Sequence, residues 1–216
     1  MSQAHTQSAT AAVSARKTKG GRVREQEILD AAARIFFERG YASTSIGDIA
    51  NDVGLLKGSL YHYISSKEEL LFRVIFEAHD VSLRATEMKL IGLPAIEAIR
   101  RYVFESVLFV CQHRQQSAVF YSEFRQLTGE HLSKILSLRD QNEQLLRTLV
   151  RKAQEDRNVR SDIDARLLTY HLIAPITALP NWYRPEGTWS PEHIAQSYAN
   201  LAIASISADN TSALTS

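Results

Sequence analysis

Cysteine is almost absent from this chain of 216 residues, in which Cys111 stands alone. A single cysteine excludes an intramolecular disulfide and any metal site built from several cysteine ligands. The sequence also lacks the long apolar run of a membrane-spanning helix and the apolar segment of a secretion signal. Together these absences favour the cytoplasm and predict no contact with a membrane.

Signatures of catalysis and of cofactor binding are missing as well. The sequence contains no nucleophile motif, no glycine-rich phosphate loop and no His-x-x-x-His spacing for a metal ion. We therefore predict no catalytic residue, no metal and no cofactor, and an enzyme is the disfavoured alternative.

Acidic residues are missing from the first 24 positions, although the net charge of the whole chain is only +1. Residues 1–21 are rich in Ser, Ala, Thr and Gln and end in two glycines, so we expect a disordered arm. The bases in and just after it are Arg16, Lys17, Lys19, Arg22 and Arg24. Such an arm is either a solvated tail or a segment that contacts DNA phosphates or the minor groove. Both interpretations are compatible if the arm becomes ordered only when it binds DNA.

The rest of the chain has the apolar spacing of helices and no alternating strand pattern, which predicts an all-α fold of about nine helices. The first helix is expected from about Arg22 to Arg39, with Gly40 ending it. Thr44 or Ser43 is expected to cap the second helix, and Asp162 the helix that contains the apolar stretch 167–179. A polar break is expected at 113–117.

Residues 44–70 predict two short helices around a tight turn, followed by a longer helix. Gly54 ends the first helix, since glycine readily adopts positive φ. The second, roughly Lys57 to Ile64, buries Leu60 and Ile64 on one face. Its other faces carry a dense group of hydrogen-bonding and aromatic side chains, as a reader of the DNA major groove requires: Lys57, Ser59, Tyr61, His62 and Tyr63.

This region resembles the DNA-binding domain of the TetR family of bacterial repressors. The resemblance rests on Ala32, Phe36, Gly40-Tyr41, Thr44, Ile46, Asp48-Ile49-Ala50, Val53-Gly54, Gly58-Ser59-Leu60-Tyr61, Tyr63 and Lys67-Glu68-Glu69-Leu70. It implies a helix-turn-helix domain at 22–69, a ligand-binding and dimerisation domain at 70–208, and a disordered tail at 209–216. Two positions depart from the family pattern: Leu56 replaces a capping Ser or Thr, and Ile64 replaces a Phe.

The resemblance also implies which residues contact DNA. Thr44 and Ser45 would bind phosphate at the start of the second helix, and Lys67 would bind phosphate at the start of the fourth. Gly58 would allow close approach, while Lys57, Ser59, His62, Tyr61 and Tyr63 would meet bases or phosphates. The alternatives are a partly core position for Tyr61 and plain surface positions for His62 and Lys67.

The family works as a homodimer on a palindromic operator, with the last two helices of each subunit at the interface. The candidate interface residues here are Trp182, Ile194, Tyr198, Leu201 and Ile206. The alternative is that these side chains fill the core of their own subunit.

The resemblance further implies a cavity for a small hydrophobic effector. Its candidate lining is Phe104, Phe120, Tyr121, Phe124, His171 and Thr177, with ordinary core packing as the alternative for each. Pro175 is expected to kink its helix and to open room beside the cavity.

The segment around Asn181-Trp182-Tyr183-Arg184-Pro185 is similar to family members that respond to acyl-CoA thioesters, including repressors of fatty-acid and steroid catabolism. An acyl-CoA effector would place its phosphates near Arg100, Arg101, Arg125, Arg139 or Arg147. Two alternatives remain: a drug-responsive efflux repressor, and a helical protein-interaction module that does not bind DNA.

Overall fold

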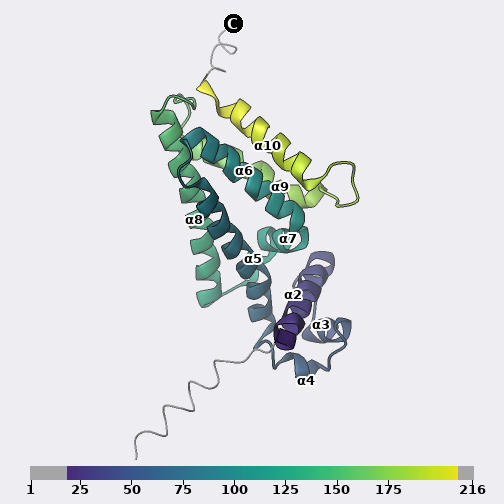
Figure 1. Ribbon diagram of the computed structural model, residues 1–216. Coiled ribbons are helices and arrows are strands. Elements are labelled where there is room, and N and C mark those ends of the chain that lie inside the picture. Colours follow the sequence, from purple (N-terminus) through teal and green to yellow (C-terminus); the bar gives the residue numbers. More distant parts are fainter. Residues whose placement is uncertain (1–18, 209–216) are drawn as a thin grey trace, which may run out of the picture.

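The computed structural model describes residues 19–208, with side chains from residue 21 onward. This part of the chain folds into nine α-helices and one short 3-10 helix (Figure 1): α2 (Lys19–Arg39), α3 (Ile46–Asp52), α4 (Lys57–Leu60), α5 (Lys67–Leu90), α6 (Ala95–Gln112), α7 (Arg114–Glu123), η1 (Phe124–Gln126), α8 (Gly129–Glu155), α9 (Ala165–Trp182) and α10 (Pro191–Ile206). Within the described residues there is no strand, only an antiparallel bridge between Val159 and Ser207. The all-α prediction is confirmed.

The first helix begins earlier than expected, at Lys19 rather than Arg22. Its first turns are docked onto the rest of the domain, because Arg24 donates to the carbonyl oxygen of Val53 and Glu25 pairs with Arg73. The remainder of the predicted arm, and the whole predicted tail at 209–216, lie outside the described residues.

Two expected helix caps are wrong. Ser45, not Thr44 or Ser43, caps α3: its hydroxyl accepts from the amide of Asp48, whose carboxylate accepts from the amide of Ser45 in return. Asp164, not Asp162, caps α9, because the carboxylate of Asp162 is held by Arg160 instead. The expected polar break at 113–117 shrinks to a single residue, since α7 already begins at Arg114.

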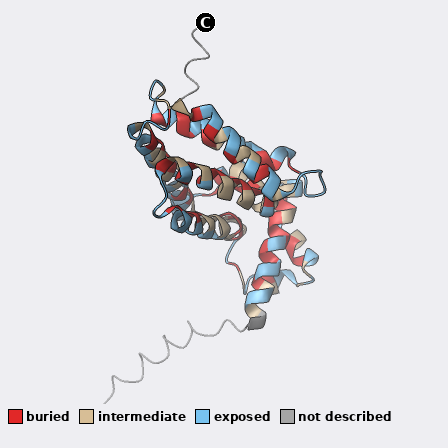
Figure 2. Ribbon diagram, turned by 45° about the horizontal axis from the view of Figure 1, so that its top comes forward, coloured by how far each residue is buried: buried red, intermediate tan, exposed pale blue. Residues whose placement is uncertain are grey.

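The buried side chains form two cores, which appear as red faces along the helices in Figure 2. The lower core joins α2, α3, α4 and the first half of α5 to side chains from α7, η1 and α8, including Phe120, Phe124 and Ile135. The upper core joins α6, α8, α9 and α10. Helix α5 contributes Leu70 to the lower core and Leu90 to the upper one, and it therefore connects the two.

Candidate DNA-binding and effector sites

The predicted reader helix is α4, which is shorter than expected and ends at Leu60. It follows a turn in which Gly54 adopts a φ of +66°, a conformation that favours glycine. Leu60 and Ile64 are buried as predicted. Lys57, Tyr61 and His62 are exposed, whereas Ser59 and Tyr63 are half-buried. Most of the predicted DNA-reading side chains are thus exposed, and α4 lies at one end of the molecule (Figure 1).

The start of the reader helix lacks a side-chain cap, as Leu56 predicts. Leu56 occupies the N-cap position, makes no capping hydrogen bond and is 80% exposed. No heavy atom lies within 4 Å of a Cβ built on Gly58. Gly58 therefore leaves open space on the surface of α4, which suits a close approach to a DNA backbone.

The structure places Thr44 inside the domain rather than on its surface. Thr44 is only 3% exposed, and its hydroxyl donates to the carbonyl oxygen of Gly40 at 2.9 Å. It ties down the turn after α2, so its hydroxyl is not available to a phosphate. Ser45 is exposed, but its hydroxyl is engaged with Asp48, which leaves the amides at the start of α3 as the feature that suits an anion.

Lys67 opens α5 and lies against the DNA-binding domain. Its Nζ is 4.1 Å from the centroid of the Tyr41 ring and 3.5 Å from the carbonyl oxygen of Ala42. Burial lowers the pKa of Lys67, and Glu123 and Asp48 oppose that shift. The side chain is therefore held in one place beside the start of α3, as a phosphate contact requires.

A cavity of about 350 Å³ lies within the larger domain. Five helices converge on it: α5, α6, α7, α8 and α9. Its aromatic and histidine lining consists of His79, Tyr102, Phe109, Phe120, Tyr121 and Tyr170. Exposed Arg139, Asp140 and Tyr170 indicate where the cavity meets solvent.

Three of the six predicted cavity residues line it: Phe120, Tyr121 and Thr177. The other three do not line it. Phe104 faces a different groove, beside α10, and Phe124 is buried in the lower core. His171 is exposed on the outside of α9, where it shares a hydrogen bond of 3.0 Å with Ser205 of α10.

Pro175, expected to open room beside the cavity, lies exposed within α9 and is not part of the lining. His79, Tyr102 and Phe109 also line the cavity, although the sequence did not predict them there. Their spacing along the helices is the same as that of ordinary core residues. For His79, the one sequence signal was a histidine on a mainly apolar helix face.

His79 and Tyr102 are the most strongly perturbed groups of the cavity wall. Burial lowers the pKa of His79 to about 4, so the ring is neutral near pH 7. Burial raises the pKa of Tyr102, whose hydroxyl interacts with Ser106 and Asn142. Burial also raises the pKa of Tyr121 to about 12. These three side chains therefore offer the cavity neutral hydrogen-bonding groups.

Among the five arginines expected near an effector's phosphates, Arg139 is the one that lines the cavity. Its guanidinium carbon lies 4.5 Å from the Phe124 ring and 5.8 Å from the Phe120 ring, and within the described residues it forms no ion pair. Arg147 pairs with Glu143, and Arg101 pairs with Glu105. Arg139 is therefore the arginine at the cavity whose charge no ion pair within the described residues neutralises.

The outer face of α9 and α10 carries exposed apolar side chains. Leu167 is 62% exposed, Leu201 66% and Trp182 42%, and Trp182 stacks on half-buried Tyr198 at 6.3 Å. Ile194 and Ile206, predicted at a dimer interface, are buried in the core of their own subunit. The stated alternative holds for these two, because they face α6 rather than outward.

Comparisons with known proteins agree with this geometry. Residues 28–74 match the family "Bacterial regulatory proteins, tetR family", and residues 92–206 match "Tetracyclin repressor-like, C-terminal domain". The chain is 28% identical to the HTH-type transcriptional repressor KstR2 of Rhodococcus jostii (strain RHA1) over 188 residues, which are 86% of this chain and 92% of that protein.

Two solved structures have the same arrangement. The ketosteroid transcriptional regulator KstR2 of Mycobacterium tuberculosis superposes with a TM-score of 0.80 at 26% identity, covering 85% of this chain and 95% of that one. AibR in complex with isovaleryl coenzyme A and operator DNA shares the fold with a TM-score of 0.75 at 23% identity, covering 86% and 98%.

No helix in the described part of the chain is long and apolar enough to cross a membrane. The helix-turn-helix, the cavity above it and both family matches point to one conclusion. The chain belongs to the TetR family of bacterial regulators, and it is a ligand-responsive, DNA-binding transcriptional repressor rather than an enzyme.

Proposed function

We propose that two copies of this protein bind a palindromic operator and that a coenzyme A thioester with an apolar acyl group releases them. The single observation that carries this proposal is that α5 serves both sites. Its first turn places Lys67 beside the DNA-binding helices, and its middle supplies His79, Ser82 and Leu83 to the cavity wall.

The DNA-binding face consists of the exposed side chains of α4 and of the turn that follows it, together with the starts of α3 and α5. Lys57 and His62 suit base edges and phosphates, and Tyr61 presents both a hydroxyl and a ring. Ser59 and Tyr63, being half-buried, also position the helix. The amides beside Ser45 and the ammonium of Lys67 would fix the domain on the phosphate backbone.

The homodimer would form through the outer face of α9 and α10. Exposed Leu167, Trp182 and Leu201 give this face the apolar side chains that an interface buries. A two-fold axis there would present two copies of α4 to half-sites spaced by ~34 Å or a multiple of it.

A coenzyme A thioester fits the chemistry of the cavity. Aromatic walls suit an acyl group, and unpaired Arg139 at the solvent side suits a phosphate. The KstR2 relatives are repressors, one described as a ketosteroid regulator, and AibR shows that this fold holds isovaleryl coenzyme A together with operator DNA. A cationic drug suits the cavity less well, because Glu143 already pairs with Arg147 and the other carboxylate of the lining, Asp140, is exposed at the solvent side next to Arg139.

The effector would act by shifting a population of two states. A ligand that binds the DNA-released state more tightly by ~3 kcal/mol would weaken operator binding about 150-fold. The difference would come from the separation of the two copies of α4, since no residue of the reader helix lines the cavity.

Fluorescence anisotropy with the DNA upstream of the gene tests the proposal. We expect salt-dependent binding, with relief by at least one member of a panel of acyl-CoA thioesters. Lys57→Ala should weaken binding and reduce its salt dependence. Lys152→Ala is the matched control, because Lys152 lies on α8 in contact with Glu155 and Asp156. Equal operator affinity across all saturating thioesters would exclude this effector class.

A further inference from the structure

The imidazole of His79 belongs to the cavity wall and carries an unused hydrogen-bond acceptor. Its Nδ1 lies 2.7 Å from the carbonyl oxygen of Ile75, one turn earlier on α5. Because a carbonyl oxygen only accepts, Nδ1 carries the proton and Nε2 carries the lone pair. Nε2 is buried and has no hydrogen-bond partner among the described residues.

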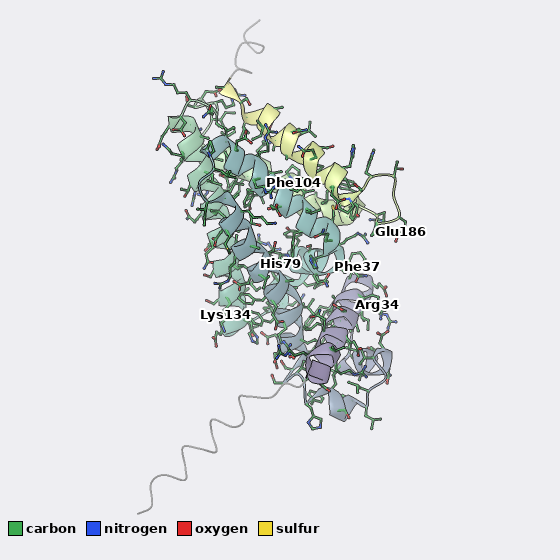
Figure 3. All side chains as sticks on the ribbon, viewed as in Figure 1. Arg34, Phe37, His79, Phe104, Lys134 and Glu186 are labelled. Atoms are coloured by element: carbon green, nitrogen blue, oxygen red, sulfur yellow. The ribbon has the colours of Figure 1, made fainter. Side chains whose placement is uncertain are left out.

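The surroundings of Nε2 are aromatic. The His79 ring stacks on Phe120 at 4.1 Å and meets the edge of Phe109 at 5.0 Å, and Figure 3 shows His79 inside the bundle near the junction with the DNA-binding domain. A buried acceptor without a partner is costly, so such groups are usually satisfied by protein, water or ligand. A neutral ring in this setting accepts a hydrogen bond and does not attract an anion.

We propose that the cavity selects an effector whose apolar skeleton carries a hydroxyl group, and that this hydroxyl donates to Nε2 of His79. The inference rests on the proposed function in taking the cavity as the effector site. Tyr121 supports it: its ring lies 6.5 Å from that of His79, and it lines the same cavity. A ligand hydroxyl can donate to His79 while it accepts from Tyr121.

Other donors fit less well. An amide N–H would bring its own carbonyl oxygen into the aromatic surroundings, and an ammonium group would pay a large desolvation cost there. A ketone offers only an acceptor, so its oxygen would face the lone pair of Nε2. A hydrocarbon leaves Nε2 without a partner. The cavity should therefore rank an alcohol above both the ketone and the hydrocarbon of the same skeleton.

Nitrogen NMR on the whole protein labelled with ¹⁵N-histidine tests the contact directly. The probes are cyclohexanol, cyclohexanone and methylcyclohexane, which are small enough to orient freely in the cavity. The His79 signals are assigned as those lost in His79→Phe. We expect cyclohexanol to move the Nε2 resonance upfield, as accepting a hydrogen bond does, and the other two to leave it in place. No movement with cyclohexanol, or equal movement with all three, overturns the inference.

Affinity provides the second measurement, by displacement of a fluorescent apolar dye from the cavity. The preference for cyclohexanol over methylcyclohexane, measured as the ratio of the two affinities, should fall about 10-fold in His79→Phe relative to the native chain. His193→Phe, an exposed position on α10, is the matched control and should keep the preference. An unchanged preference in His79→Phe overturns the inference.

These experiments separate the inference from the proposed function, because neither uses operator DNA or coenzyme A. If acyl-CoA thioesters do not release the operator but cyclohexanol still moves the Nε2 resonance, the proposed effector class is refuted and the proposed hydroxyl contact is supported. If a thioester releases the operator but cyclohexanol does not move the Nε2 resonance, only the proposed hydroxyl contact is refuted.

Discussion

Replacing Arg73 by alanine should destabilise the DNA-binding domain more than any exposed charge deletion on the same helix. Arg73 is 14% exposed and pairs with Glu25, which is 11% exposed; it also bonds to Glu77 and to the carbonyl oxygen of Tyr63 at 3.2 Å. Removing one member of a buried ion pair typically costs 3–5 kcal/mol. Since both side chains keep some exposure, we expect about 3 kcal/mol, the lower end of that range.

Urea unfolding followed by circular dichroism at fixed protein concentration measures this cost. Arg84→Ala is the control, because Arg84 is 73% exposed and pairs with Asp80 on the surface of the same helix. That substitution should leave the free energy of unfolding almost unchanged, because solvent screens an exposed pair. The Tyr63 carbonyl would also lose its donor, so operator affinity should fall under conditions where Arg73→Ala is still folded. A cost for Arg73→Ala equal to that of Arg84→Ala would refute the reasoning.

Three further predictions concern single positions. Leu56→Ser should add the missing cap of α4 and stabilise the protein by ~1 kcal/mol in thermal unfolding. Leu201→Arg should shift the protein toward monomer in light scattering, whereas Met88→Arg, 74% exposed on α5, should not. The pKa of His79 is about 4 folded and 6.5 in its ordinary state, so the unfolded chain takes up the proton first as pH falls. Between pH 7 and pH 5 the free energy of unfolding of the native protein should therefore fall by about 2 kcal/mol more than that of His79→Phe.

The DNA-binding domain was predictable because its signals are local. The turn at Gly54, the buried pair Leu60 and Ile64, and the uncapped Leu56 can all be recognised within a few residues of sequence. Thr44 is the instructive failure there. Thr44 and Ser45 both suit a cap, and the side-chain hydrogen bond of Thr44 to Gly40 is what decides between them.

The residues of the cavity and of the interface were harder to predict, because helical periodicity identifies an apolar face but not what that face contacts. Phe104 and Phe109 lie five residues apart on α6, yet only Phe109 reaches the cavity. On α10 apolar residues occur on all sides, so the register against α6 decides that Ile206 turns inward and Leu201 outward. That register depends on the packing of the whole bundle, which no local pattern encodes.

The two ends of the α5–α8 contact explain how a ligand in the cavity would reach the operator. At the base, the carboxylate of Glu68 accepts from the amide of Thr128 at 2.8 Å, and Phe72 stacks on His131 at 4.4 Å. Further along, α5 and α8 face each other across the cavity, without such ties. If a ligand separated the helices there, the base would be the fixed point and α5 would rotate about it. Because α2 packs on α5, the DNA-binding domain would turn with α5, and a small opening at the cavity would become a larger change in the separation of the two reader helices.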